Sequence, residues 1–217
     1  MAKSVSVLLV DDHAVVREGY RRLLERSPSI EVVGEAFDAQ SAYIAYLEHR
    51  PRVTVMDIAL PGASGFDALR RIRTRVPQAQ VLMFSMHEDT VFAARSLQSG
   101  ARGYITKAAA PEVLVEAVLA VARGEPYLPE RVAHELALRN FGERKVVTEL
   151  LPEREFEVLR MLVAGRRLAD IAESLDLTVK TIANYQSVLR QKLGAGSAVQ
   201  LLQAAARLGI VSEHGAS

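Results

Sequence analysis

VTVMDIALPGASG, residues 53–65, is the stretch that decides the fold. A mostly apolar run leads to Asp57, and a Pro-Gly pair follows a few residues later. Such a run is typical of a strand buried on both faces, and Pro-Gly is typical of a turn. The stretch therefore predicts that a buried strand delivers the carboxylate of Asp57 to the rim of a sheet.

The chain on both sides of this stretch alternates between short apolar runs and longer segments with apolar residues at helical spacing. Strands are expected at residues 5–10, 31–37, 53–56, 80–84 and 102–105, and helices at residues 14–26, 39–50, 66–76, 89–98 and 111–121. This alternation predicts an α/β doubly wound, five-stranded parallel sheet covered by helices on both faces.

The carboxyl ends of parallel strands meet at one edge of the sheet, where ligands bind. The residues at these ends are Asp11 and Asp12, Asp57, Ser85 and Lys107. Three converging carboxylates repel one another unless a divalent cation lies between them, and oxygen ligands without Cys or His favour Mg²⁺. Lys107 adds a positive charge and Ser85 a hydroxyl donor, so Asp57 is a candidate nucleophile that forms an acyl phosphate.

Each of these residues taken alone is more typical of a helix cap or a solvated loop. Their joint occurrence after the first, third, fourth and fifth predicted strands is what favours a phosphoryl-transfer site.

Composition narrows the class of protein. The 217 residues leave room for two domains, and the absence of cysteine excludes disulfides and thiolate chemistry. The first apolar run is too short for a secretory signal, and no stretch reaches the ~18–20 apolar residues of a membrane span. We therefore expect a cytoplasmic protein without a membrane association.

The pattern changes after residue 123. Residues 124–150 begin with turn residues, contain a short helical pattern and continue as a charged stretch, which indicates a linker with an embedded helix. Helices are then expected at residues 152–164, 168–175, 178–193 and 197–208, with Thr178 and Ser197 as N-caps and a turn at Asp176. Two helices joined by a tight turn and flanked by scaffold helices describe a helix-turn-helix module, at about residues 168–187.

The second helix of this module is a candidate DNA-binding helix. Its apolar positions, expected in the core, are Ile182, Tyr185, Leu189 and Leu193. Ala183, Asn184 and Ser187 then face outward, and such a face suits a helix in the major groove, where Asn can pair with adenine. Lys180 and Thr181 at its start are expected to hold phosphates. Because the basic excess is mild, charge alone fits a solvated helix of a protein-interaction domain equally well.

Four segments carry a resemblance to a known family: VLLVDDH, VMDIALPGASG, MFSMH and GYITKA. Through them, residues 5–122 resemble the receiver domain of two-component response regulators, which has a flavodoxin-like sheet. The resemblance implies that Asp57 is the phospho-acceptor and that Asp11 and Asp12 are the metal-binding pair. It further implies that Ser85 turns toward the phosphoryl group and that the ring of Tyr104 reorients with it.

The same resemblance assigns roles to three more positions. Lys107 matches the lysine of the family's site, and the backbone carbonyl of Ala59 is expected to complete the Mg²⁺ shell. Ala59 and His87 occupy positions that tune the lifetime of the phosphoryl group in this family. His87 is interpreted as a rate-tuning surface residue rather than as a catalytic base.

Residues 151–193, LPEREFEVLRMLVAGRRLADIAESLDLTVKTIANYQSVLRQKL, are similar to the LuxR/NarL-type DNA-binding domain. Tyr185 and the segment ALRNF, residues 137–141, match the GacA/UvrY branch of the NarL/FixJ family. Several members carry Lys where this chain has Ala183 and Ser187, so their sequence preference does not transfer. In the family, the helix at residues 197–208 makes the dimer contact, which implies inverted DNA half-sites.

These observations predict a receiver domain at residues 1–123, a linker at 124–147 and a DNA-binding domain at 148–213. A histidine kinase is expected to phosphorylate Asp57 with Mg²⁺ bound, which frees or dimerises the DNA-binding domain and regulates transcription. The expected partners are the kinase, double-stranded DNA and a second copy of the chain. We expect no enzyme activity beyond the receiver's own phosphotransfer and dephosphorylation.

Two other functions are compatible with parts of the pattern. A DNA-binding protein that ignores phosphorylation would use the first domain only as a dimerisation scaffold, and the complete acid cluster argues against it. A HAD-like phosphohydrolase also forms an aspartyl phosphate, but it needs a second Asp at the position of Ala59.

Overall fold

The computed structural model describes residues 4–86, 90–140, 151–175, 177–208 and 210. His87 and Asp176, two positions with sequence-based interpretations, lie outside the described residues. The chain divides into two compact units, the first made mainly of residues 1–134 and the second mainly of residues 135–217. Within the described residues, no helix combines the length and apolarity that crossing a bilayer requires.

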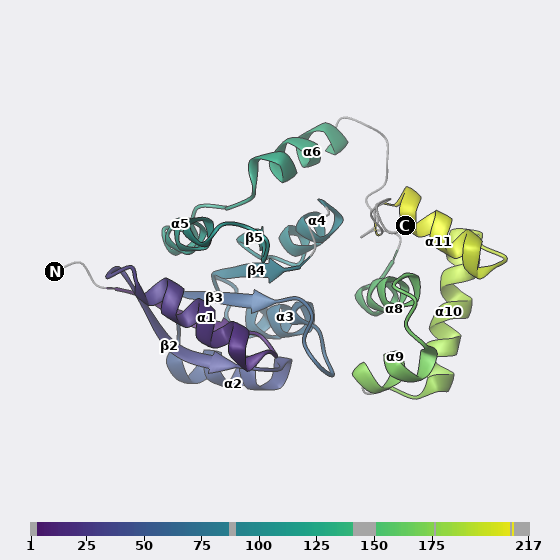
Figure 1. Cartoon of the computed structure of the whole chain (residues 1–217), viewed down its shortest axis with the longest axis horizontal. Helices are drawn as coiled ribbons and strands as arrows, with labels where there is room; N and C mark the ends of the chain where they lie inside the picture. Colours follow the sequence, from purple (N-terminus) through teal and green to yellow (C-terminus); the bar gives the residue numbers. More distant parts are fainter. Residues whose placement is uncertain (1–3, 87–89, 141–150, 176, 209, 211–217) are drawn as a thin grey trace. The chain divides into compact units, whose positions relative to one another are not determined.

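The first unit is built on a five-stranded parallel sheet, which confirms the predicted doubly wound fold (Figure 1). Its strands are β1 (Val5–Val10), β2 (Ile30–Ala36), β3 (Val53–Asp57), β4 (Val81–Ser85) and β5 (Gly103–Thr106). They lie in the order β2-β1-β3-β4-β5. The chain therefore reverses its direction of travel across the sheet between β1 and β3. Such a reversal marks the position where doubly wound sheets bind ligands.

Helices cover both faces of this sheet. They are α1 (Ala14–Glu25), α2 (Ala39–His49), α3 (Gly65–Arg75), α4 (Thr90–Gln98) and α5 (Pro111–Ala122). Val7 and Leu9 point toward one face, where they pack in a core that includes Leu24 of α1 and Val118 of α5. The helices α2 and α3 contact each other on the opposite face. This two-sided burial is why the strands read as continuous apolar runs rather than as alternating patterns.

Side chains and turn residues fix where the helices begin. Asp38 and Ser41 form a reciprocal capping box at the start of α2, with Ser41 N–H donating to Asp38 Oδ1 at 2.6 Å. Ser64 and Asp67 form the same arrangement at the start of α3. Pro111 opens α5, where its fixed φ suits the first helical turn. These local signals fix the starts of α2, α3 and α5, whereas the parallel pairing of the strands brings their carboxyl ends to one rim.

The helix α6 (Glu130–Asn140) lies within residues 124–150, the stretch where the sequence predicts a linker with an embedded helix. Just before it, Tyr127 pairs with Gly103 in a parallel bridge at the edge of β5. The beginning of the linker therefore belongs to the sheet of the first unit.

The second unit contains α8 (Glu153–Val163), α9 (Leu168–Ser174), α10 (Val179–Leu193) and α11 (Ala198–Arg207). The predicted caps are present, since Thr178 Oγ1 accepts from Thr181 N–H at 3.1 Å and Ser197 Oγ accepts from Gln200 N–H at 3.2 Å. The buried core residues of this unit include Phe156, Leu159, Ile171, Ile182, Leu189 and Leu201. Four packed helices with α9 and α10 adjacent match the predicted helix-turn-helix arrangement.

Candidate functional site

The strand ends bring Asp11 and Asp57 together at the reversal point of the sheet. Val10 pairs with Met56 across β1 and β3, so the residue after each lies at the same level. Asp57 is the last residue of β3, and both aspartates are almost completely buried, with 4% of Asp11 and 3% of Asp57 exposed. Two buried carboxylates at one rim need a cation, because an unpaired buried charge is strongly unfavourable.

Lys107 supplies a cation between them. Its Nζ donates to Asp57 Oδ2 at 2.6 Å and also contacts Asp11 Oδ2. The lysine is held in place by its own backbone, whose N–H donates to the Ser85 carbonyl at 2.7 Å. The structure thus brings together four of the residues that the sequence singles out, from the ends of four strand segments.

Burial and charge act against each other in this cluster. Burial raises the pKa of Asp57 above its ordinary value, and the Lys107 ammonium and the Ala59 N–H offset only part of that rise. For Lys107, burial alone would lower the pKa, but the carboxylates of Asp57 and Asp11 outweigh it and the pKa is raised. Lys107 therefore stays charged, while Asp57 is less acidic than an exposed aspartate.

Asp12 and His13 form the outer, exposed end of the cluster. His13 Nδ1 lies 2.6 Å from Asp12 Oδ1 and 3.5 Å from Asp11 Oδ1, and His13 N–H donates to Asp11 Oδ1 at 2.9 Å. The expectation that no histidine lies among the acidic residues is therefore wrong. His13 directly follows Asp12 at the start of α1, and this position brings its imidazole next to the acid pair. The VDDH sequence contained this signal, since His13 directly follows the acid pair.

The donors of this cluster fit a divalent cation. Asp11, Asp12 and His13 each offer a ligand atom, and these atoms lie within 4.8 Å of one another. Carboxylate oxygens are the preferred ligands of Mg²⁺, and three carboxylates exceed the single charge of Lys107. The residues present therefore fit the metal that the fold implies.

The loop after β3 is shaped around Asp57. Ala59 N–H donates to Asp57 Oδ1 at 3.1 Å, and Gly65 N–H donates to the Ile58 carbonyl at 2.9 Å. A Cβ on Gly65 would overlap the Asp57 carbonyl oxygen, so only glycine fits there. Gly62 has φ +73°, which confirms the turn predicted from the Pro-Gly pair. Backbone packing thus fixes the position of the carboxylate.

Ser85 lies in β4, which pairs with β3, Tyr104 lies in β5, the edge strand beyond β4, and both residues are buried. Ser85 pairs with Thr106 and Met83 pairs with Tyr104. Because alternate residues point to the same face, Ser85 and Tyr104 are diagonal neighbours on one face of the sheet.

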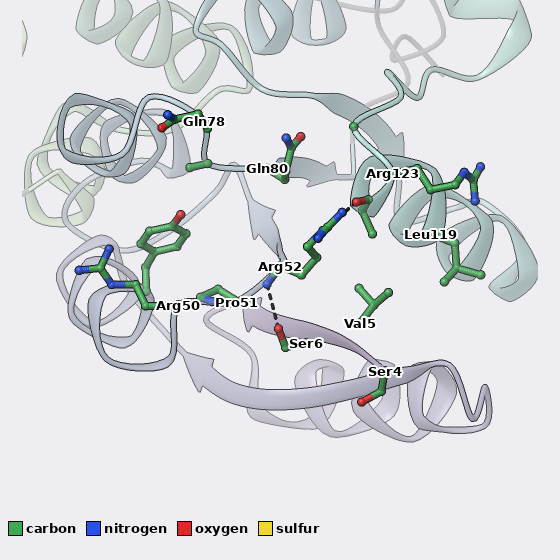
Figure 2. A pocket seen from close by; sticks show the side chains of 14 residues that line it. Ser4, Val5, Ser6, Arg50, Pro51, Arg52, Gln78, Gln80, Leu119 and Arg123 are labelled. Atoms are coloured by element: carbon green, nitrogen blue, oxygen red, sulfur yellow. Dashed lines mark hydrogen bonds between the residues drawn. The ribbon is translucent and has the colours of Figure 1, made fainter. Parts of the chain in front are cut away.

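A separate cavity of about 860 Å³ lies at the opposite edge of the sheet (Figure 2). It is bordered by Arg50, Arg52 and Arg123, at the ends of α2 and α5 and the start of β3. Arg50 Nε donates to the Leu47 carbonyl at 3.1 Å, and Arg52 Nε donates to the Ala122 carbonyl at 2.8 Å. These guanidinium groups satisfy carbonyls at helix C-termini, where positive charge is favourable. The cavity is far along the strands from Asp57 and is not part of the acid cluster.

The exposed face of α10 is the one that the helical spacing predicts. The residues expected in the core are buried at Ile182 and Leu189 and half-buried at Tyr185 and Leu193. Four residues expected to face outward are exposed, namely Lys180, Ala183, Asn184 and Ser187. Thr181, the expected phosphate contact at the start of the helix, is half-buried. Lys192 Nζ donates to both oxygens of Glu155 at 2.8 Å, which ties α10 to α8. The helix therefore presents small and polar side chains on a braced scaffold.

The first unit has the fold and acid cluster of a receiver domain, and the second has the arrangement of a helix-turn-helix domain. Comparison with known families agrees. Residues 7–119 match the response regulator receiver domain, and residues 149–205 match the luxR family of bacterial regulatory proteins. The chain belongs to the two-component response regulators of the NarL/FixJ family, which carry a LuxR-type helix-turn-helix domain and act as transcriptional regulators.

Similar proteins cover nearly the whole chain. The response regulator UvrY of Escherichia coli K12 is 34% identical over 208 residues, covering 95% of both chains. The response regulator GacA of Pseudomonas viridiflava is 34% identical over 209 residues, covering 95% of this chain and 98% of that protein. The predicted GacA/UvrY branch is thereby confirmed. The structure of RcsB from Salmonella enterica serovar Typhimurium, bound to promoter P1flhDC with phosphomimetic BeF3−, matches with a TM-score of 0.68 at 26% identity, covering 93% of this chain and 98% of that one.

Proposed function

We propose that Asp57 is the residue phosphorylated by a sensor histidine kinase. The observation that carries this proposal is the convergence of Asp57, Asp11 and Lys107 at the reversal point of the sheet. A carboxylate oxygen of Asp57 attacks the phosphorus of the kinase phosphohistidine. The new P–O bond forms as the P–N bond breaks, and the electron pair of that bond leaves with the imidazole nitrogen.

The neighbouring side chains of this chain support that transfer. The Nζ of Lys107, already 2.6 Å from Asp57 Oδ2, is placed to neutralise a phosphoryl oxygen after transfer. The hydroxyl of Ser85 donates a hydrogen bond to another phosphoryl oxygen. Asp11, Asp12, Asp57 and the carbonyl of Ala59 would hold Mg²⁺, which when bound would supply further positive charge for the oxygens of the transferring group. The activity of the protein is limited to accepting and hydrolysing its own phosphoryl group.

The phosphoryl group then changes the balance between two states of the receiver. Ser85 and Tyr104 are the switch residues, because they share one face of β4 and β5 next to the acceptor. Phosphorylation favours the state in which the DNA-binding unit is free or dimeric, and a difference in affinity between the two states suffices. Residues 1–123, 124–147 and 148–213 act as receiver, linker and DNA-binding domain.

The α10 helix of the second unit enters the major groove of DNA. Asn184 reads a base, Ala183 and Ser187 pack close to base edges, and Lys180 and Thr181 hold phosphates at the N-terminus of the helix. Two copies of the chain bind an inverted pair of half-sites, since Val199 and Leu202 on α11 are exposed apolar residues suited to a dimer contact. We expect the protein to act in the cytoplasm, together with its DNA target.

Phosphorylation of the full-length chain by a small donor such as acetyl phosphate tests the acceptor directly. With Mg²⁺ present, wild type should gain one phosphoryl group that hydroxylamine removes, as expected for an acyl phosphate. Asp57→Asn should gain none, whereas the matched variant Asp67→Asn, in the capping box of α3, should gain it normally.

Genome-wide DNA occupancy in cells with the kinase tests the link to transcription. Wild type and Asp57→Asn should differ in occupancy. Equal occupancy and equal reporter output would instead identify a DNA-binding protein that does not depend on phosphorylation. Steady turnover of small phosphate esters would point to a phosphohydrolase.

A further inference from the structure

The segment that leaves α5 is turned back toward β5 by a defined helix end. Gly124 N–H donates to the Val121 carbonyl at 2.9 Å, and Glu125 N–H donates to the Ala120 carbonyl at 3.1 Å. Gly124 has φ +83°, so this pair of bonds forms a Schellman motif. The direction of the chain after α5 is therefore set by local structure.

Tyr127 then hydrogen-bonds to β5 on both sides of Gly103. Tyr127 N–H donates to the Arg102 carbonyl at 3.1 Å, and Tyr104 N–H donates to the Tyr127 carbonyl at 2.9 Å. A Cβ on Gly103 would lie 2.8 Å from the Tyr127 carbonyl oxygen and 2.9 Å from a methyl group of Leu82, so this close approach requires glycine. We call residues 124–127 the strap.

The side chain of Tyr127 provides a second attachment. It packs against the core between α5 and the sheet. Burial raises the pKa of its phenol, and the Glu116 carboxylate of α5 raises it further through its charge and a hydrogen bond. The phenol is therefore neutral and can donate to Glu116, so the strap is fixed to α5 as well as to β5.

The strap is bonded to the residue that is placed to report the state of Asp57. Tyr104 is fully buried and lies diagonally from Ser85 on the same face of β4 and β5. The peptide N–H of Tyr104 is the one held by Tyr127. A shift of the Tyr104 backbone therefore changes the strap, and a loose strap frees the Tyr104 N–H.

We propose that the strap carries the phosphorylation state of Asp57 from β5 to the linker, with Gly103 and Tyr127 as positioning residues. The inference rests on the proposed function. A phosphoryl group draws the Ser85 hydroxyl toward it and leaves more space for the buried ring of Tyr104, which tightens both hydrogen bonds of Tyr127. The helix α6 begins three residues after Tyr127, and its Val132 is 2% exposed, so tightening fixes the start of the linker.

Thermodynamic reciprocity gives this proposal a sharp consequence. If phosphorylation favours the closed strap by a given factor, then a variant whose strap is open must bind a phosphoryl mimic more weakly by the same factor. We expect the affinity for the phosphoryl mimic to fall about 5-fold or more, since 5-fold is the lower end of measured allosteric couplings.

The test uses the full-length chain with Mg²⁺ and beryllofluoride as the phosphoryl mimic, followed by amide hydrogen exchange. In wild type, beryllofluoride should slow exchange at the amides of Tyr104 and Tyr127. Gly103→Ala should exchange at least about 10-fold faster at both amides and bind beryllofluoride about 5-fold more weakly. Gly19→Ala is the matched control, because a Cβ at Gly19 of α1 meets nothing within 4 Å.

A milder variant keeps the test decisive if Gly103→Ala does not fold. Tyr127→Phe removes only the phenol bond to Glu116, and it should shift exchange and affinity in the same directions by smaller factors. The proposal is overturned if beryllofluoride slows exchange at residues 57–65 of wild type but leaves Tyr104 and Tyr127 unchanged. It is equally overturned if a loosened strap leaves the affinity unaltered. Absence of beryllofluoride binding to wild type would instead refute the phosphorylation of Asp57, and the strap proposal with it.

Discussion

Replacing Lys107 by methionine tests whether one ammonium group holds two buried carboxylates in place. The side chain of Lys107 is 8% exposed, and those of Asp11 and Asp57 are 5% exposed each. Methionine has a similar length and fits the same space without a charge. The variant leaves two neighbouring buried carboxylates without their shared cation, and removing one partner of a buried ion pair costs about 3–5 kcal/mol.

Protonation sets an upper limit to this loss. A carboxyl group with an ordinary pKa of about 3.9 takes up a proton at pH 7 at a cost of about 4 kcal/mol. One proton shared between the two aspartates relieves most of their repulsion, so we expect a loss of about 3–4 kcal/mol at pH 7. The folded variant then binds a proton that the unfolded chain does not. Its stability therefore rises by about 1.4 kcal/mol per pH unit as pH falls, and the loss shrinks to about 1 kcal/mol at pH 5.

Urea denaturation of the full chain without Mg²⁺ measures the loss of unfolding free energy at pH 7 and at pH 5. Lys180→Met, an exposed lysine of α10, is the control and should leave the transition of the first unit unchanged. The double variant Lys107→Met/Asp57→Asn should lose less than Lys107→Met alone, because one of the two carboxylates is gone. A loss below about 1 kcal/mol at pH 7, or an equal loss at both pH values, would show that Lys107 is not the cation that holds the two buried carboxylates.

Three further outcomes are expected. Asp57→Asn should stabilise the first unit by about 1 kcal/mol and so raise its thermal midpoint. The reason is that burial raises the pKa of Asp57, so the charged carboxylate becomes more costly to the folded state as pH rises. Calorimetry that shows no gain in the midpoint between pH 5 and pH 8 would contradict this. Gly65→Ala should destabilise the first unit by about 4 kcal/mol or more in urea denaturation, since the new methyl group overlaps the backbone at Asp57, and a variant as stable as wild type would exclude the overlap. Lys180→Ala should weaken DNA binding similarly on all sequences and lower the slope of log affinity against log salt concentration by about 1. Asn184→Ala should instead lose about 1–3 kcal/mol of binding free energy, mainly on the preferred sequence. Binding titrations over a range of salt concentrations distinguish the two variants.

The fold could be predicted from the sequence because each of its signals is local. Apolar runs bounded by turn residues located every strand to within about one residue, and hydroxyl caps at Thr178 and Ser197 located the starts of α10 and α11. The shifts that did occur follow from pairing between strands. Ser85 continues β4 because it pairs with Thr106 of β5, which no pattern within a single segment reveals.

The site was predictable as a set of strand ends but not as a set of contacts. Parallel topology alone places Asp11, Asp57 and Lys107 at one rim. The contact of His13 with Asp12 depends on side-chain directions at the start of α1, which the helical pattern leaves open. The same holds for Tyr127, because its pairing with β5 joins two segments separated by all of α5. Interactions that are distant along the chain and made through backbone groups leave little trace in residue types.

Any side chain at Gly65 would overlap the backbone of Asp57. This overlap distinguishes the evolutionary loss of the phosphorylation site from the loss of the loop that surrounds it. A descendant that has abandoned phosphorylation has no chemical reason to keep an aspartate at position 57, yet it still needs glycine at position 65 to close the loop. Receivers that keep this glycine without the acid are therefore expected to be folded domains put to another use. Receivers that lose both have rebuilt the loop, so the two positions read together tell a repurposed domain from a decaying one.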